Sequence, residues 1–190
     1  MPQKQGGKHL TATKVLAISG HAQNGKDTVA GMIDKKLSGD GYSVLVAHYA
    51  DLLKHICRSC FEWNGLKDDA GRHLLQYVGT DVVRKKAPDF WVDFIISVLN
   101  LFEDAWDYVI IPDSRFPNEI AKLRTCGFDV THIRVIRGGD FVSPLTPEQQ
   151  QHASETALDD YPVDYAIHND GSLNDLEGKV NNFVEEFVYD

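Results

Sequence analysis

The sequence predicts an α/β fold in which a central parallel sheet of about five strands is covered by helices on both faces. Short apolar runs, typical of buried parallel strands, alternate along the chain with longer segments whose apolar residues recur every three or four positions, as in helices. A strand, a helix and a parallel strand in succession require a right-handed crossover, which places the helices on the faces of the sheet. The length of 190 residues and the hydrophobic content of 43% suit one domain with a buried core.

The first predicted unit is a strand, a loop and a helix. Residues 15–18 form an apolar run that ends before Ser19-Gly20, and apolar residues return at helical spacing across residues 26–37. Ligands bind beyond the carboxyl ends of strands in such sheets, so the loops that follow Ser19, Ala47 and Ile111 should converge on one site. The same patterns predict the later elements in this order: a strand at 42–47, a helix marked by Leu52, helices around 73–83 and 90–102, a strand at 108–111, a helix at 118–124, strands at 129–136 and 164–168, and a helix at 173–188.

Two stretches lack such patterns. Residues 1–13 are polar, and we expect them to be a flexible tail before a single domain at 14–190. Residues 138–161 hold Gly, Pro, Ser and Gln with little periodicity. A structureless connection of that length is uncommon in a compact domain, so we predict that this lid segment (residues 138–161) closes over a ligand site.

The chain carries 19 Lys and Arg residues against 28 Asp and Glu residues, a formal net charge of −9. Such an acidic protein has no broad attraction for a nucleic-acid backbone, so we expect no nucleic-acid polymer as a partner. No apolar run reaches the roughly 20 residues that a membrane-spanning helix needs, and we expect no membrane partner. An anionic ligand must therefore meet local positive charge, of which the candidates are Lys26, Arg72, Arg115, the run 84–86, Arg134 and Arg137.

Residues 20–28, Gly-His-Ala-Gln-Asn-Gly-Lys-Asp-Thr, match G-x-x-x-x-G-K between a buried strand and a helix, the setting in which this motif binds phosphate. Its glycines let successive N–H groups point inward, the helix N-terminus adds positive potential, and Lys26 can bridge the β- and γ-phosphates of ATP. An ordinary glycine-containing turn is the alternative. The loop residues expected to bind ATP are Gly20, Asn24, Gly25, Lys26, Asp27 and Thr28.

Asp27 departs from this motif, because the position after Lys usually holds a Ser or Thr whose hydroxyl ligates magnesium. Magnesium keeps several waters and accepts carboxylate oxygen, so Asp27 can hold a magnesium-bound water. Asp113, at the end of the apolar strand 108–111, is the second carboxylate expected at the metal, directly or through water. A simple cap at the end of that strand is the alternative for Asp113.

Six stretches, taken in order, resemble one family. They are Gly25-Lys-Asp-Thr28, Tyr49-Ala-Asp-Leu-Leu-Lys54, Leu75-Gln-Tyr-Val-Gly-Thr80, Pro88-Asp-Phe-Trp91, Ile111-Pro-Asp-Ser-Arg-Phe-Pro-Asn-Glu119, and His152-Ala-Ser-Glu-Thr156 with Asp159-Asp-Tyr-Pro162. From about residue 14 to 173 the chain resembles the deoxynucleoside monophosphate kinases best known from tailed bacteriophages, within the P-loop nucleoside monophosphate kinases. The resemblance implies a three-layer P-loop NTPase fold. The family commonly has Pro where this chain has Leu52, so the start of that helix differs.

The resemblance also implies an acceptor-binding helical region at about 50–104. Its implied acceptor-binding residues are Asp51, Lys54, Arg72, Gly79, Thr80, Trp91, Arg115 and Glu119, and its implied catalytic residues are Lys26, Asp113 and Arg84. Solvated helix charges are the alternative for Arg72 and Arg84, and a core position is the alternative for Trp91. Arg137, just before the lid segment, is expected to clamp the ATP phosphates or to stack on adenine. Nothing in the sequence fixes a role for Glu155 at the lid hinge.

Together these residues predict ATP- and Mg²⁺-dependent phosphorylation of deoxynucleoside monophosphates to diphosphates. The attacking group is a phosphate oxygen, which is already ionised at neutral pH because the second phosphate pKa is about 6, so no general base is needed. Two alternatives stay open: a P-loop kinase of another small acceptor such as dephospho-coenzyme A, and a non-catalytic nucleotide-binding module. We expect a cytoplasmic protein, in the host cytoplasm if a virus encodes it, and the sequence leaves a homodimer open.

Overall fold

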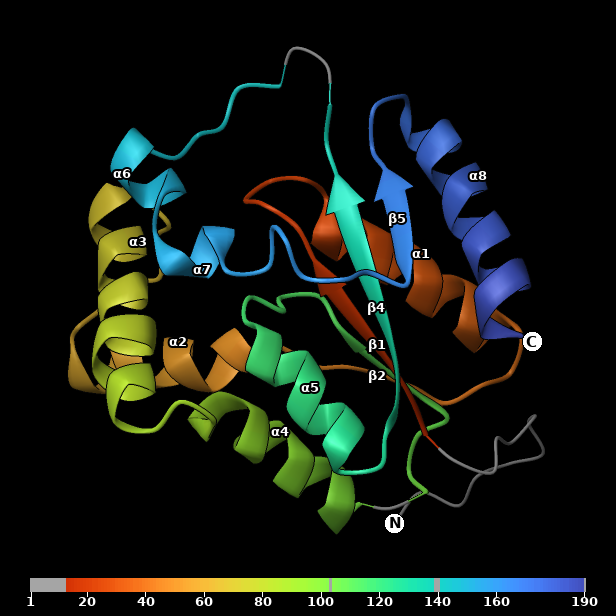
Figure 1. Ribbon diagram of the computed structural model, residues 1–190, viewed down its shortest axis with the longest axis horizontal. Coiled ribbons are helices and arrows are strands. Elements are labelled where there is room, and N and C mark those ends of the chain that lie inside the picture. The colour runs from red at the N-terminus through yellow and green to blue at the C-terminus, as the bar shows by residue number, and fades with distance from the viewer. Residues whose placement is uncertain (1–12, 103, 139–140, 190) are drawn as a thin grey trace.

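Five parallel strands form the central sheet of the computed structural model, which describes residues 13–102, 104–138 and 141–189 (Figure 1). The strands are β1 (Lys14–Ser19), β2 (Val44–Val46), β3 (Tyr108–Ile111), β4 (Asp129–Ile136) and β5 (Tyr165–His168). Their order across the sheet is β2-β3-β1-β4-β5, and every neighbouring pair is parallel. The predicted α/β class and parallel sheet are confirmed, and β1 lies at the centre of the sheet.

Helices connect and cover these strands. Their bounds are α1 (Lys26–Gly39), α2 (Tyr49–Cys60), α3 (Asp69–Gln76), α4 (Phe90–Leu101), α5 (Pro117–Thr125), α6 (Pro147–Gln150), α7 (Ala153–Thr156) and α8 (Leu173–Phe183), with π-helical stretches η1 (Tyr77–Arg84) and η2 (Val184–Val188). The helix expected around 73–83 is therefore α3 continued in π register, and the C-terminal helix ends in the same way. The lid segment contains two short helices, α6 and α7, that the sequence did not predict.

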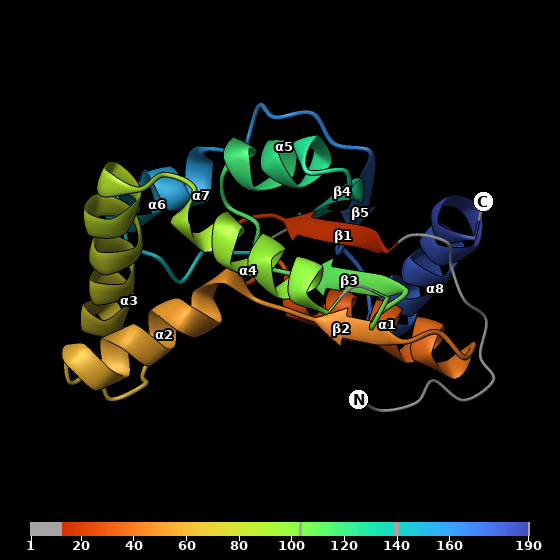
Figure 2. The same ribbon diagram turned by 90° about the horizontal axis from the view of Figure 1, so that it is seen from below.

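Alternation along β1 divides the core into two layers. Leu16 and Ile18 pack with residues of α1 and α8, whereas Val15 and Ala17 pack with residues of α4 and α5. Figure 2 shows α4 and α5 on one face of the sheet and α1 with α8 on the other. Because both faces are buried, the strands need apolar side chains in both directions, which explains their continuous apolar runs.

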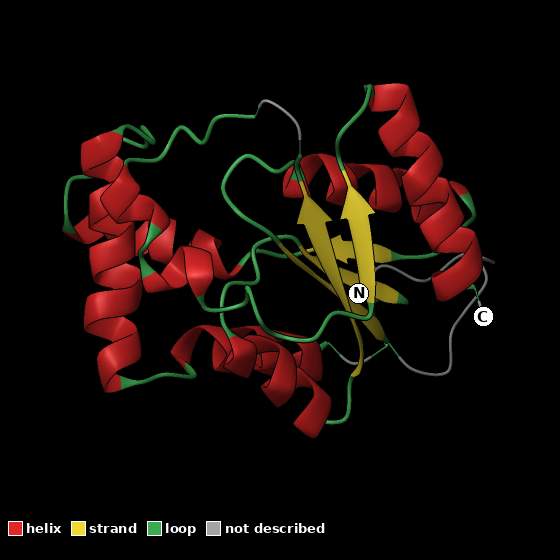
Figure 3. Ribbon diagram, turned by 45° about the horizontal axis from the view of Figure 1, so that its top comes forward, coloured by secondary structure: helices red, strands yellow, loops and turns green. Residues whose placement is uncertain are grey.

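A helical lobe, formed by α2, α3 and η1, projects from one end of the sheet (Figure 3). It has a small core of its own, in which Cys57, Trp63 and Val78 are buried. Trp63 Nε1 donates to the Leu66 carbonyl oxygen at 2.9 Å, which closes the connection between α2 and α3. The lobe lies within the region expected to bind the acceptor.

The two ends of the predicted pattern differ slightly from the structure. The tail expected at residues 1–13 lies outside the described residues except for Thr13, whose hydroxyl donates to the Trp106 carbonyl oxygen at 2.8 Å. The strand expected at 42–47 is shorter, because β2 is an edge strand that pairs only with β3. Within the described part of the chain, no helix has the combined length and apolar character needed to cross a membrane.

Candidate active site

The phosphate loop (residues 20–28) joins the carboxyl end of β1 to α1. Gly20 has a φ of +138°, and Gly25, the residue before α1, has a φ of +98°. Residues other than glycine rarely adopt these backbone conformations. A Cβ atom on Gly20 would lie 2.3 Å from the Val135 carbonyl oxygen, and one on Gly25 would lie 2.5 Å from Asn169 Nδ2. The two glycines therefore let the loop press closely against the ends of β4 and β5.

The side chains of Asn24, Asn169 and Arg137 hold the part of this loop that precedes α1. Asn24 Nδ2 donates to the Val135 carbonyl oxygen at 3.1 Å, and Asn169 Nδ2 donates to the Asn24 carbonyl oxygen at 2.9 Å. Arg137 Nη1 donates to the Gln23 carbonyl oxygen at 3.1 Å. The Asn24 side chain is buried and braces the loop against β4, so its expected contact with ATP stays a prediction.

The Lys26 ammonium lies within the loop, where it donates to the carbonyl oxygens of Gly20 and His21, both at 2.8 Å. Burial, together with the positive charge of Arg115, lowers the pKa of Lys26 to about 7, although nearby carboxylates oppose this shift. A phosphate that enters the loop brings negative charge and raises this pKa. Phosphate binding and protonation of Lys26 are therefore coupled.

Asp27 lies in the first turn of α1 with its carboxylate 82% exposed. His48 Nε2 is 3.6 Å from Asp27 Oδ1, and His48 Nδ1 is 3.6 Å from Asp51 Oδ2, both ion-pair distances. Contact with His48 lowers the pKa of Asp27, and the same contact raises the pKa of His48. Asp27 is thus a charged, solvent-facing carboxylate beside the phosphate loop.

Asp113 follows β3 and contacts the start of α2. Its Oδ1 accepts the Tyr49 N–H at 3.0 Å, and its Oδ2 accepts the Ala50 N–H at 2.9 Å. These are backbone donors without partners inside the helix, and the negative charge complements the helix dipole. Each carboxylate oxygen keeps a second lone pair, so a contact with a metal-bound water remains available to Asp113.

The donor set fits a magnesium ion that arrives with a nucleotide. No group of three or more His, Cys, Asp or Glu side chains within the described ranges could enclose a metal ion. Magnesium commonly binds through one or two carboxylates plus substrate phosphates and keeps several waters. Asp27 and Asp113 line one cavity with Lys26, as such an ion requires, and their part in metal binding stays a prediction.

That cavity, of about 850 Å³, joins the phosphate loop to the helical lobe. The loops after β1, β2 and β3 reach it through Lys26, His48 and Asp113, so the expected convergence of these loops is confirmed. Asp51 does not line it and instead pairs with Lys54 Nζ at 3.0 Å. The other residues expected to bind the acceptor or to act in catalysis all contribute to the wall, namely Lys54, Arg72, Gly79, Thr80, Arg84, Trp91, Arg115 and Glu119.

Arg84 and Glu119, both predicted to act on the ligands, form an ion pair with each other. Glu119 is 1% exposed and accepts the N–H groups of Arg115 and Phe116 at 2.6 and 3.0 Å. Burial raises the pKa of Glu119, and the charge of Arg84 opposes that rise. The Arg84 guanidinium also lies 4.0 Å from the centroid of the Phe116 ring. Both residues therefore stabilise the start of α5, and their contacts with a ligand stay predictions.

Trp91 occupies a core position, the alternative that the sequence left open. Its side chain belongs to the core layer of α4 and is 3% exposed, and its Nε1 donates to the Gly79 carbonyl oxygen at 3.0 Å. Only a small part of the ring is exposed where Trp91 lines the cavity, so the expected base-stacking contact stays a prediction. A Cβ atom on Gly79 would lie 2.8 Å from Leu53 Cδ2, so this glycine lets η1 approach α2.

Arg72 and Tyr49 are among the residues of the cavity wall whose polar groups lack partners within the described ranges. The Arg72 guanidinium makes no ion pair or hydrogen bond within the described ranges, in contrast to Arg84. The Tyr49 hydroxyl is buried without a hydrogen-bond partner in the same ranges, and burial raises the pKa of Tyr49 well above its usual value. Arg72 thus offers a free positive charge to an acceptor in the cavity, whereas the Tyr49 hydroxyl is enclosed in the core layer of α4 and α5.

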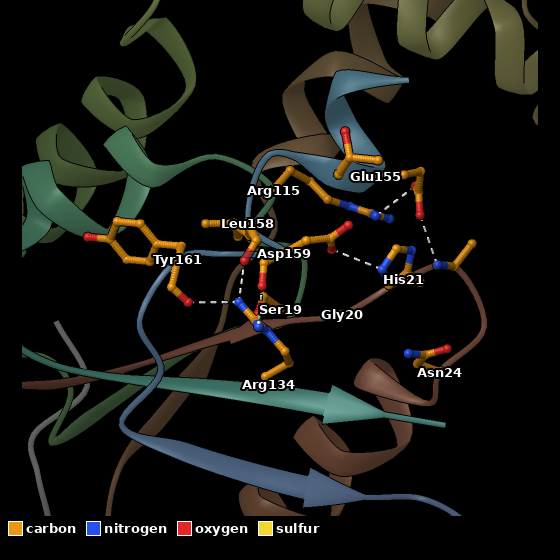
Figure 4. A network of polar contacts seen from close by, with 12 residues as sticks. Ser19, Gly20, His21, Asn24, Arg115, Arg134, Glu155, Leu158, Asp159 and Tyr161 are labelled. Carbon is orange, nitrogen blue, oxygen red and sulfur yellow. Dashed lines mark hydrogen bonds and ion pairs between the residues drawn. The ribbon is translucent and has the colours of Figure 1, made fainter. Parts of the chain in front are cut away.

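Sequence reasoning missed His48 and Tyr49, although a signal was present. Both follow β2 directly, and the loop after that strand was already expected to reach the site. Sequence reasoning also left Glu155 without a role. Its Oε1 pairs with Arg115 Nη1 at 2.7 Å, and its Oε2 accepts the Ala22 N–H at 2.9 Å (Figure 4). The lid segment has no periodicity that points to this residue.

Solved P-loop kinases share the fold. The APS kinase of Mycobacterium tuberculosis in complex with AMPPNP and APS aligns with a TM-score of 0.54 and 16% identity, covering 92% of this chain and 99% of that chain. Shikimate kinase from Aquifex aeolicus aligns with a TM-score of 0.50 and 11% identity, covering 92% and 98%. At these identities the likeness concerns the fold alone, and the predicted three-layer P-loop fold is confirmed.

Viral proteins are similar in sequence. The deoxynucleotide monophosphate kinase of Enterobacteria phage T4 is 33% identical over 125 residues, 64% of this chain and 48% of that protein. The protein of the same name from Escherichia phage RB69 is 31% identical over 115 residues, 60% and 44% of the two chains. An uncharacterized protein, ORF77 of Ictalurid herpesvirus 1, is 30% identical over 173 residues, 89% and 69%. The chain thus spans about half the length of the two phage kinases it matches.

A family model gives the same result over more than half of the chain. The model described as deoxynucleotide monophosphate kinase matches residues 53–180. The matched span covers most of the helical lobe, the Asp113 loop and the lid segment, whereas the phosphate loop lies before it and is identified by its motif and geometry. The resemblance seen in the sequence is confirmed, and the chain belongs to the deoxynucleotide monophosphate kinase family.

Proposed function

We propose that this protein transfers the γ-phosphoryl group of ATP, in a magnesium-dependent reaction, to a deoxynucleoside monophosphate and so forms a diphosphate. One observation carries the proposal: a single cavity of about 850 Å³ connects the phosphate loop to the positively charged wall of the helical lobe. Two nucleotides must meet end to end in such a reaction, and the cavity has a cationic region for the phosphates of each. Family membership supports a deoxynucleotide as the acceptor.

The donor half of the reaction rests on the phosphate loop. Backbone N–H groups at the start of α1 and the Lys26 ammonium are suited to the β- and γ-phosphates of ATP. The solved complex of the mycobacterial kinase contains AMPPNP, an ATP analogue, which supports ATP as the donor here. Arg137 lines the cavity beside this loop and lies 4.7 Å from the Phe141 ring centroid, a position suited to the outer part of the donor nucleotide.

The acceptor half rests on the cations of the helical lobe. Arg72 has an unpaired guanidinium in the cavity, so we assign it the monophosphate of the acceptor, with Lys54 as a second contact. The phosphate is ionised at neutral pH and attacks without a general base. Catalysis then consists of bringing the two anions into line and neutralising the spreading charge, the task we assign to Lys26 and Arg115.

Asp27 and Asp113 are the residues we assign to the magnesium ion, through bound water. A bound magnesium ion would neutralise part of the negative charge of the phosphates. Asp27 takes this part well because contact with His48 keeps its pKa low, so the carboxylate stays ionised. Asp113 keeps α2 in position at the same time, which links the metal side of the cavity to the acceptor side.

The test is production of diphosphate from a panel of ribo- and deoxyribonucleoside monophosphates with ATP and magnesium, against a Lys26→Ala control. We expect rapid turnover of one or more deoxynucleotides that depends on Lys26 and is abolished by a chelator. If the protein binds ATP but forms no diphosphate from any nucleotide of the panel, the proposal is overturned. Dephospho-coenzyme A and small alcohols would then be tested as acceptors before a non-catalytic nucleotide-binding module is accepted. The cytoplasmic location and the homodimer stay predictions.

A further inference from the structure

Glu155 links three parts of the molecule that lie far apart in the sequence. It belongs to α7 in the lid segment, its first oxygen pairs with Arg115 from the loop after β3, and its second oxygen accepts the Ala22 N–H of the phosphate loop. Arg115 Nη1 also donates to the Ser154 carbonyl oxygen at 3.3 Å. Figure 4 shows the carboxylate between the guanidinium and the loop backbone.

Arg134 holds the end of the lid segment that follows Glu155. Arg134, at the end of β4, donates to the carbonyl oxygens of Leu158, Asp159 and Tyr161. The Asp159 carboxylate in turn lies 2.9 Å from His21 Nε2, a second contact with the phosphate loop (Figure 4). The three carbonyl oxygens that Arg134 binds fix the turn that follows α7. This turn in turn fixes the position of Glu155 beside the phosphate loop.

The Glu155 side chain is 7% exposed, and both of its oxygens have partners. Ala22 lies three residues before Gly25, in the part of the phosphate loop that we call the outer arm (residues 20–23), whereas the helix N-terminus that attracts a phosphate begins at Lys26. The carboxylate therefore holds the outer arm without occupying the helix N-terminus. Arg115 and Glu155 also line both the 850 Å³ cavity and a second cavity of about 500 Å³ under the lid segment.

We propose that Glu155 is a positioning residue, which fastens the outer arm of the phosphate loop and the Arg115 guanidinium to the lid segment and so aims Arg115 at the transferred phosphoryl group. This inference rests on the proposed function for its catalytic part only. A hydrogen bond to a charged group changes an equilibrium constant by about 10- to 100-fold. Loss of the contact between Glu155 and Arg115 should therefore lower kcat by about that factor. KM values should change much less, because Arg115 would still be present but no longer aimed.

The structural part is tested first, by amide hydrogen exchange of the nucleotide-free protein. Glu155→Gln keeps the shape but turns one acceptor into a donor that faces another donor, and Glu155→Ala removes both contacts. We expect exchange in residues 20–25 and 153–158 to rise together, about 10-fold or more, with β3 unchanged. Glu148→Gln, an exposed glutamate of the same lid segment, is the matched control and should change nothing. Unchanged exchange in Glu155→Ala would overturn the proposal whatever the enzyme does.

The catalytic part is tested by steady-state kinetics and by ATP binding in a calorimeter. We expect kcat to fall in both Glu155 variants, ATP to bind with a Kd within about threefold of the parent protein, and Glu148→Gln to match the parent. Tighter ATP binding in Glu155→Gln would instead mean that the carboxylate competes with the nucleotide, and it would overturn the positioning role. If the parent protein phosphorylates nothing in the panel while the exchange result holds, the proposed function fails. The structural role of Glu155, which fastens the phosphate loop and Arg115 to the lid segment, would still stand.

Discussion

The phosphate loop and the helical lobe face each other across one cavity, yet they are held in different ways. Hydrogen bonds of Asn24, Asn169 and Glu155 tie the loop to β4, to the end of β5 and to the lid segment. The lobe rests on a three-residue core and on close approaches such as that of Gly79 to Leu53, and it leaves Tyr77 and other large apolar side chains exposed. The contrast indicates a preformed donor site opposite a softer acceptor site.

Lys26 provides the largest test of this contrast. Because its ammonium is the charge nearest the transferred phosphates in the proposed reaction, Lys26→Met should lower kcat/KM by about 10²- to 10³-fold. Lys54→Met, the matched change on the lobe, should lower it by no more than about 10-fold, since Lys54 is partly exposed and already paired with Asp51. Equal losses in a steady-state assay would remove the distinction between the two sides.

Arg84 and Arg72 separate structural from ligand-binding charge on the acceptor side. Arg84→Ala leaves the buried Glu119 carboxylate unpaired, so the free energy of unfolding at pH 7 should fall by about 3–5 kcal/mol. The pKa of Glu119 is raised by burial, so the folded state binds a proton more readily than the unfolded state, and the variant should regain stability as the pH falls. Urea unfolding at pH 5 and pH 7 measures both.

Arg72→Ala should have the opposite profile. Its guanidinium stabilises no described carboxylate, so the urea midpoint should stay that of the parent protein, whereas KM for the acceptor should rise about 10-fold or more. A lower midpoint with an unchanged acceptor KM would make Arg72 a structural residue and would contradict its assignment to the monophosphate.

Paired glycine substitutions compare the rigidity of the two sides directly. Gly20→Ala meets a backbone oxygen at 2.3 Å and requires a positive φ, so unfolding free energy should fall by about 2–4 kcal/mol. Gly79→Ala meets the flexible end of Leu53 inside a helix, so its effect should stay within about 1 kcal/mol. A Gly79 variant as unstable as the Gly20 variant, in the same denaturant series, would show a lobe packed as firmly as the loop.

The smallest expected effect is a proton linked to donor binding. The pKa of Lys26 is about 7 in the free protein and should rise when phosphates bind, so ATP binding should take up a proton above pH 7 and weaken by up to about tenfold per pH unit. Calorimetry in buffers of different ionisation enthalpy detects the proton. The Lys26→Met protein should lack this Lys26-linked uptake; the same uptake in both proteins would assign it to another group.

The sequence predicted most of the donor side because its signals are local. Strands β1 and β3 are apolar runs, β4 alternates between apolar and polar residues, and the phosphate loop is a contiguous motif beside a helix. The acceptor side was less predictable, since the π register of η1 has no periodic signature and Trp91 gave equal grounds for a core and a stacking role. The contact of Glu155 with Ala22 joins residues 133 positions apart, and no local sequence pattern near either residue predicts it.

The π register of η1 has a consequence for changes in chain length. A π turn holds more residues than an α turn, so η1 contains about one residue that an α-helix of the same rise would not need. Deleting one residue there would remove the excess and let the α register continue, so the later side chains of that helix would keep their present directions. Arg84 would then still face Glu119. The same deletion in α3, which has no residue to spare, would turn every later side chain by about 100° around the axis.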